Sequence, residues 1–247
     1  MSWKTSFPRE NIFYETDNGI LYCGDCLEIL SRFPKESVDL IVTDPPYLIS
    51  YKTNHRKDKN HDFCKPIKND DNQELIREFI NIAYYVLKMN SAFYSFGSWK
   101  TVDFFKAEIE KYFKLKNIVV WVKNNWSAGD LKAQFGQQYE LIFYALKGRR
   151  LINGKRLPDV WFFERVSGSK QLHQNEKPTK LLQCIIKVSS NDNELILDPF
   201  AGSGSTLVAA HILNRRWIGI EIEEKYCEIA KQRIEPLLNI NTRVENE

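Results

Sequence analysis

The strongest constraint on the fold is a regular alternation of short apolar runs with longer segments of helical periodicity. Several runs are apolar at nearly every position, which is typical of strands covered on both faces of a sheet. The predicted strands are 20–23, 38–43, 92–96, 118–122, 139–146, 195–198 and 217–220. The predicted helices are 26–33, 73–88, 101–113, 179–189, 205–214 and 223–238. This order predicts an α/β fold with a central, mostly parallel sheet flanked by helices on both faces.

Two longer segments, 50–71 and 147–174, do not fit this alternation. Both are rich in lysine and arginine, and loops of this length inside a compact domain are usually functional or mobile. The whole chain carries 35 Lys+Arg against 32 Asp+Glu, a net charge of only +3. Any basic surface must therefore be local. We expect the polar carboxyl-terminal stretch, 239–247, to be frayed.

The cysteines and the amino terminus indicate the compartment. Five cysteines are an odd number, and residues 1–6 lead into no apolar run, so we expect a reducing, cytoplasmic setting. No stretch approaches the roughly 18 apolar residues of a membrane span. Cys23, Cys26, His61 and Cys64 are zinc-ligand types, but Cys23 ends a predicted buried strand, so we expect no metal.

The first candidate site motif follows the predicted strand 38–43 and reads Asp44-Pro45-Pro46-Tyr47. Two prolines cannot continue a strand ladder, so a stiff loop leaves the sheet at the carboxyl end of the strand, where open α/β sheets bind ligands. A carboxylate, a proline carbonyl and an aromatic ring suit a planar group with an exocyclic amine. Taken alone, the motif can also be a rigid turn.

The second motif lies between a predicted strand and a predicted helix, and reads Asp198-Pro199-Phe200-Ala201-Gly202-Ser203-Gly204. A glycine-rich turn of this kind lets a cofactor approach the backbone and the helix amino terminus. About 20 residues further on, at the end of the next predicted strand, Glu221 can accept hydrogen bonds from ribose hydroxyls. Glu221 can also be a solvated residue at a helix start.

Together, the two motifs resemble those of DNA amino-methyltransferases, which use S-adenosylmethionine to methylate adenine N6 or cytosine N4. The catalytic motif comes first, as in the permuted β group of that family. The resemblance extends from Gly19 to Pro236 and implies one Rossmann-like methyltransferase domain over residues 1–247. Its parts would be a catalytic half (19–146), a short DNA-recognition insert (147–174) and a cofactor-binding half (175–238).

Two further positions are carried over from the resemblance. Asp25 matches a family carboxylate near the cofactor adenine, although Asp25 with Glu28 also reads as a capping box. Lys177 matches an element along the methionine part of the cofactor, where it could pair with the carboxylate. In the alternative interpretation of that element, Pro178 simply begins a helix.

The resemblance also gives the catalytic motif a role. Hydrogen bonds from the amine to Asp44 and the Pro45 carbonyl would pull electron density onto the nitrogen, while Tyr47 stacks on a flipped base. No metal or covalent intermediate is required. The family mostly pairs Asp in the first position with adenine and Ser with cytosine, so Asp44 favours adenine N6.

The segment 147–180 holds nine basic and three acidic residues. Phosphate neutralisation is the natural use of such an excess. The DNA-binding candidates are Lys147, Arg149, Arg150, Lys155, Arg156 and Lys170.

The predicted function is therefore methyl transfer from S-adenosylmethionine to adenine N6 in double-stranded DNA by a cytoplasmic enzyme of prokaryotic or phage origin. A homodimer and a cognate restriction endonuclease are possible partners that the resemblance implies. The alternatives are an N4-cytosine enzyme, an RNA or protein-amide methyltransferase, and a DNA-binding subunit with a degenerate site.

Overall fold

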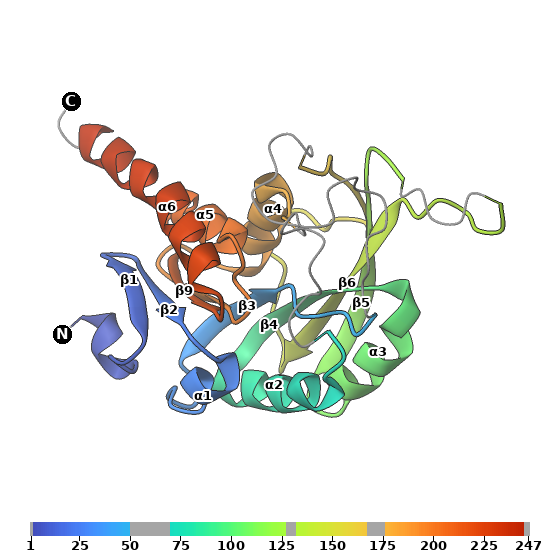
Figure 1. The fold of residues 1–247 in the computed structure, drawn as a ribbon, viewed down its shortest axis with the longest axis horizontal. Helices are drawn as coiled ribbons and strands as arrows, with labels where there is room; N and C mark the ends of the chain where they lie inside the picture. The colour runs from blue at the N-terminus through green and yellow to red at the C-terminus, as the bar shows by residue number, and fades with distance from the viewer. Residues whose placement is uncertain (1, 50–69, 127–131, 167–175, 245–247) are drawn as a thin grey trace.

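The computed structural model describes residues 2–49, 70–126, 132–166 and 176–244 (Figure 1). Within these ranges the strands form a single sheet in the order β1-β2-β9-β8-β3-β4-β6-β5-β7. The strands are β1 (Ile12–Thr16), β2 (Gly19–Cys23), β3 (Val38–Thr43), β4 (Leu87–Gly97), β5 (Lys114–Val122), β6 (Tyr139–Lys147), β7 (Val160–Phe162), β8 (Leu195–Asp198) and β9 (Arg216–Glu221).

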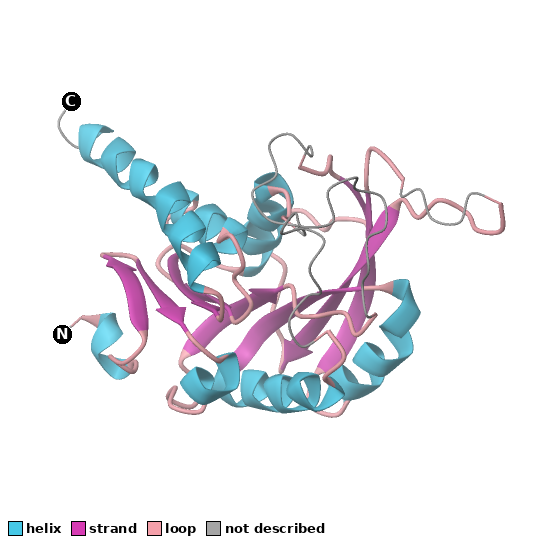
Figure 2. Cartoon of the chain, in the orientation of Figure 1, coloured by secondary structure: helices cyan, strands magenta, loops and turns pink. Residues whose placement is uncertain are grey.

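Helices cover both faces of this sheet (Figure 2). One apolar core joins the sheet to α1 (Cys26–Leu30), α2 (Gln73–Val86) and α3 (Val102–Glu110). A second core, on the other face, joins it to α4 (Thr179–Ser189), α5 (Ser205–Ile212) and α6 (Glu224–Val244). The predicted α/β fold class is therefore confirmed. No helix of the described residues is long and apolar enough to cross a membrane.

Strand direction changes along the sheet. The run β2-β9-β8-β3-β4 is parallel throughout, whereas β6 is antiparallel to both β4 and β5. Since β6 runs backwards, its first residues lie at the carboxyl end of β4, where Leu141 pairs with Gly97. Its last residue, Lys147, pairs with Ser91 at the opposite edge of the sheet.

Several elements differ from the prediction, most clearly α2, α6, β1 and β7. Helix α2 ends at Val86 rather than 88, because Leu87 adopts an extended conformation and begins β4. Helix α6 continues to Val244, which lies within the stretch 239–247 that we expected to be frayed. Strands β1 and β7 were not predicted; β1 is a half-buried edge strand and β7 has only three residues, so neither shows the long apolar run of an inner strand.

Candidate active site

The two candidate motifs leave the sheet from neighbouring strands. Leu40 and Ile41 of β3 pair with Ile196 and Leu197 of β8. From this pair the chain proceeds in opposite directions, from β3 toward β4 and from β8 toward β9. Such a switch point leaves a crevice at the carboxyl ends of the strands, which is where doubly wound folds bind their ligands.

A buried hydrogen bond joins the two motifs. Thr43 Oγ1 donates to Asp198 Oδ1 over 2.9 Å, between residues 155 positions apart in sequence. Asp198 also accepts from the backbone N–H of Phe200 at 3.2 Å. It is only 3% exposed, and burial raises its pKa to about 6. We predicted Asp198 as a cofactor residue. In the structure its carboxylate links the glycine turn to strand β3 through these two hydrogen bonds.

Asp44 lies in a compact charge cluster. Its Oδ1 accepts from the Tyr47 hydroxyl at 2.5 Å, and its Oδ2 accepts from Lys177 Nζ at 2.5 Å. Glu140, at the start of β6, accepts from the same hydroxyl at 3.2 Å and lies 3.3 Å from the same ammonium. Glu140 also accepts from Lys123 Nζ at 2.5 Å. The cluster therefore holds two carboxylates and two ammonium groups.

Burial controls the protonation of this cluster. It raises the pKa of Asp44, and the charge of Glu140 acts in the same direction, while Lys177 opposes both. Burial would also raise the pKa of Glu140, but the charges of Lys177 and Lys123 outweigh it and bring that pKa to about 2. Burial lowers the pKa of Lys177, and the two carboxylates reverse this to a net increase. The ammonium groups thus favour the charged forms of the two carboxylates, which burial alone would disfavour.

The backbone of the Asp44-Pro45-Pro46-Tyr47 loop is fixed from two sides. Thr101 Oγ1 donates to the Tyr47 carbonyl at 2.9 Å. The N–H of Leu48 donates to Asp70 Oδ1 at 2.8 Å. Thr101 lies just before α3 and Asp70 lies before α2, so two separate segments hold the loop.

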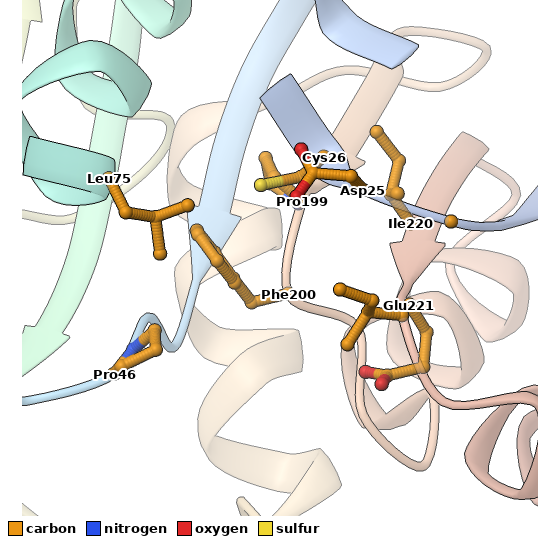
Figure 3. Close-up of a pocket in the computed structure, with 10 residues that line it drawn as sticks. Asp25, Cys26, Pro46, Leu75, Pro199, Phe200, Ile220 and Glu221 are labelled. Carbon is orange, nitrogen blue, oxygen red and sulfur yellow. The ribbon is translucent and has the colours of Figure 1, made fainter. Parts of the chain in front are cut away.

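A pocket lies beside this loop, at the carboxyl ends of β2, β8 and β9 (Figure 3). It is lined by Gly24, Asp25, Cys26, Pro46, Leu75, Pro199, Phe200, Ile220, Glu221 and Ile222. In the close-up, the Phe200 ring and the Glu221 carboxylate lie on adjacent parts of the wall, with Pro46 opposite. The pocket thus combines an apolar wall with carboxylate groups.

Glu221 fixes the glycine turn. Its Oε2 accepts from the N–H of Gly202 at 2.9 Å and its Oε1 accepts from the N–H of Glu223 at 2.8 Å. Burial raises the pKa of Glu221 to about 7. Gly204 ends the turn at φ +78°, and a Cβ there would lie 2.7 Å from Cβ of Ala230. The turn therefore requires glycine at this position both for its backbone and for its contact with α6.

Two predicted cofactor residues have structural partners. Asp25 accepts from the N–H groups of Leu27 and Glu28, so it is the N-cap of α1 as well as a pocket residue. Lys177 lies in the Asp44 cluster rather than among the pocket residues. Its ammonium group pairs with the carboxylates of Asp44 and Glu140, and its predicted pairing with a cofactor carboxylate stays a prediction.

The DNA-binding candidates are spread over both edges of the sheet. The prediction that Lys147 contacts DNA is wrong. Lys147 is 3% exposed, its ammonium donates to the carbonyls of Tyr84 and Leu87, and it pairs with Glu36. A buried, paired ammonium cannot reach a phosphate. Arg149 and Arg150 follow Lys147 in sequence. The backbone N–H of Arg149 donates to Asn90 Oδ1, and the Arg150 guanidinium pairs with Glu194. The remaining candidates are Lys155 and Arg156, which are exposed, and Lys170, which lies outside the described residues.

Sequence reasoning missed two residues that the structure brings to the site. Glu140 is the first carboxylate of β6, and no motif marks it. Arg233 of α6 donates to Ser203 and Ser205 and pairs with Glu176 at 2.9 Å. It thereby links the glycine turn to the residue before Lys177. Of the zinc-ligand types, Cys23 and Cys26 are free thiols, and His61 and Cys64 lie outside the described residues.

The structure places the Asp44-Pro45-Pro46-Tyr47 loop next to a glycine turn and the Glu221 carboxylate, which is the arrangement expected of an S-adenosylmethionine-dependent amino-methyltransferase. The comparisons with known proteins agree. The DNA methylase family, which comprises N6 and N4 methyltransferases, matches residues 38–232. The chain belongs to this family.

Curated relatives and a solved structure extend the comparison. The chain is 32% identical over 247 residues to the type II methyltransferase M2.DpnII of Streptococcus pneumoniae, covering 90% of this chain and 92% of the relative. It is 32% identical to the DNA adenine methyltransferase YhdJ of Escherichia coli, covering 86% and 81%. The M1.HpyAVI–SAM complex is 27% identical, with a TM-score of 0.65 over 87% of this chain and 98% of that one.

S-adenosylmethionine is the cofactor of this family, and the pocket fits it. The apolar wall of Phe200, Pro199 and Ile222 suits an adenine ring, and the Glu221 carboxylate provides an acceptor for ribose hydroxyls. The glycine turn leads directly into the start of α5, whose first N–H groups suit a polar or anionic part of the cofactor.

Proposed function

We propose that this protein transfers a methyl group from S-adenosylmethionine to the N6 amino group of adenine in double-stranded DNA. The observation that carries the proposal is the position of Asp44, one residue beyond a bond that joins its strand to the cofactor turn. Asp rather than Ser in the first motif position favours adenine, and one relative is named a DNA adenine methyltransferase.

The amine would bind at Asp44 and the Pro45 carbonyl. An exocyclic amine is a poor nucleophile because its lone pair is delocalised into the ring. Two accepted N–H bonds favour a pyramidal nitrogen and return density to it. The positive charge that develops on nitrogen lies beside the Asp44 carboxylate, so this residue stabilises the transition state more than the ground state.

S-adenosylmethionine supplies an electrophilic methyl group when it is bound. The residues of this chain hold and orient it: Phe200 against the adenine, Glu221 at the ribose, and the Gly202–Gly204 turn at the backbone approach. The base must leave the duplex to reach Asp44, which costs a few kcal/mol, and stacking on Tyr47 would offset part of that cost.

DNA contact would come from the exposed basic residues of the insert. Lys155 and Arg156 are exposed, as is Arg165, whose N–H bonds Asn124 just beyond the end of β5. Lys170 stays a candidate of the same kind. Such contacts position the duplex without reading its sequence. Within a single domain of residues 1–247, we assign 147–174 to this task, with 19–146 as the catalytic half and 175–238 as the cofactor half.

The biological setting is also part of the proposal. We place the enzyme in the cytoplasm of a prokaryote or a phage-infected cell. It would act as a monomer or homodimer on the site of a cognate restriction endonuclease, since type II methyltransferases are among its relatives. N4-cytosine methylation is the second candidate, because the matched family includes both reactions.

One experiment tests the function. The protein is incubated with S-adenosylmethionine and unmethylated genomic DNA, the DNA is digested to nucleosides, and the products are identified by mass spectrometry. N6-methyl-2′-deoxyadenosine is the expected product. N4-methylcytosine would replace the base assignment, and methyl transfer to RNA or protein alone would overturn the proposal. Asp44→Ala, which should bind DNA normally, must lose turnover.

A further inference from the structure

Both oxygens of the proposed amine acceptor are already occupied in this structure. Asp44 accepts the Tyr47 hydroxyl on Oδ1 and the Lys177 ammonium on Oδ2, each at 2.5 Å. An incoming amine therefore competes with these two donors for the lone pairs of Asp44 and can displace one of them. A displaced donor that found no other acceptor would be left buried and unpaired, which is costly.

Glu140 offers that other acceptor. It lies on a different strand, yet its Oε2 is 3.2 Å from the Tyr47 hydroxyl and 3.3 Å from Lys177 Nζ. Both distances exceed the corresponding 2.5 Å contacts to Asp44. Each donor is thus strongly bonded to Asp44 and already within reach of Glu140.

The position of Glu140 is rigid. Glu140 pairs with Trp121 of β5 in the ladder. Lys123, the residue that follows β5, donates from Nζ to Glu140 Oε1 at 2.5 Å. This leaves Oε2 directed at the Asp44 cluster. The side chain of Glu140 is 16% exposed and that of Asp44 is 20% exposed, so both are largely shielded from water.

We propose that Glu140 is a positioning residue that takes over the Tyr47 hydroxyl and the Lys177 ammonium when the amine of the substrate base binds Asp44. The exchange keeps every buried charge paired at each stage. It rests on the proposed function only in that Asp44 receives an amine, and it applies equally to adenine and to cytosine.

The charges around Asp44 make the idea testable by pH. Asp44 faces Lys177 from the segment before α4, Glu140 from β6, Tyr47 from its own loop and Asp198 from β8. Removing the Glu140 charge removes a group that raises the pKa of Asp44. The methyl-transfer rate falls at low pH, where Asp44 is protonated. This fall, the acid limb of the pH–rate profile, should then move to lower pH.

The experiment compares Glu140→Gln with wild type in single turnover at saturating S-adenosylmethionine. We expect the methyl-transfer rate to fall about tenfold or more, cofactor affinity to stay within about twofold, and the acid limb to shift downward. The matched control is Glu108→Gln, which removes another buried carboxylate paired with Lys111 and Arg77 on α3 and α2. It should leave both the rate and the profile unchanged.

The other outcomes overturn the inference. A wild-type rate with or without a shifted limb would mean that no exchange is needed. A lower rate with an unshifted limb would reduce Glu140 to a structural support. If Glu140→Gln does not fold, Glu140→Asp keeps the charge on a shorter side chain and should slow transfer with the limb in place; a wild-type rate in that variant would refute the exchange.

Failure of the proposed function is recognised separately, because wild type would then methylate no DNA. In that case ¹³C NMR titration of the Asp44 carboxyl in wild type and Glu140→Gln tests the charge relation directly. An unchanged Asp44 pKa would contradict the inference, and a lowered one would support it.

Discussion

The Thr43 hydroxyl donates to the Asp198 carboxylate across 2.9 Å, and this bond joins the strand that carries Asp44 to the strand that carries the glycine turn. Thr43 is 1% exposed, so no water can replace it. The relative position of the amine site and the cofactor site therefore depends on a pair of side chains outside both binding surfaces.

Replacing Thr43 by valine keeps the side-chain shape and removes the donor. We expect the free energy of unfolding to fall by about 1–3 kcal/mol, because a buried carboxylate loses a partner. Urea denaturation at pH 8 measures the change. Thr43→Ser keeps the hydroxyl and is the control; equal losses in both variants would show that the bond contributes nothing.

Cofactor affinity should depend on pH through Glu221, whose pKa burial raises to about 7. The ionised carboxylate can accept from two ribose hydroxyls, whereas the protonated form has less acceptor capacity. Affinity for S-adenosylhomocysteine should therefore rise between pH 6 and 8, roughly tenfold per pH unit below the pKa at most. Calorimetry across this range measures it.

Two variants sharpen that measurement. Glu221→Gln should bind more weakly and lose the pH dependence. Glu223→Gln removes a neighbouring carboxylate that pairs with Lys225 and whose charge raises the pKa of Glu221; it should keep the pH dependence, with the midpoint moved to lower pH. A pH-dependent Glu221→Gln protein would assign the titration to another group.

Gly204 and Gly154 separate backbone strain from steric clash. Both have positive φ, +78° and +72°, but a Cβ at Gly204 meets Ala230 at 2.7 Å whereas one at Gly154 meets nothing within 4 Å. Gly154→Ala should cost about 1 kcal/mol. Gly204→Ala should cost at least about 2 kcal/mol more, because α6 cannot move freely, and should weaken cofactor binding. Thermal and urea unfolding of both variants test this, and equal costs would refute the clash.

Lys147 and Lys155 should respond in opposite ways. Lys147→Met removes an ammonium that bonds two carbonyls and lies 4.5 Å over the Tyr84 ring, so stability should fall by about 2 kcal/mol or more. Its DNA affinity should stay unchanged. Lys155→Ala should keep stability and reduce the salt slope of DNA binding by about 1. Fluorescence anisotropy from 50 to 200 mM salt gives the slope; a reduced slope for Lys147→Met would restore it as a phosphate contact.

Much of the fold could be predicted because its inner strands are short and fully apolar. The two motifs also came together as their positions at strand ends implied, since the ends of parallel strands share one edge of a sheet. Glu140 could not be predicted from motifs at the carboxyl ends of strands. Its strand runs backwards, so its contribution comes from the start of the strand, and only the pairing of β6 with β4 reveals this.

Lys147 was misassigned for a related reason. A count of charges along the chain treats all members of a basic segment alike, but β6 carries Lys147 to the far edge of the sheet and buries it. Lys177 shows the opposite case: its sequence neighbourhood suggested the cofactor, while its burial between two carboxylates is a tertiary property. The local sequence does not show which residues from distant parts of the chain belong to the same charge cluster.

The reversed direction of β6 has a consequence for how such enzymes diversify. Both ends of the strand are anchored, Glu140 within the Asp44 cluster and Lys147 beneath Tyr84, and its ladder to β4 fixes the register between them. The connection from β5 into β6 can therefore gain or lose residues without sliding the ladder. A change in the length of that connection would therefore leave Glu140 in its position beside Asp44.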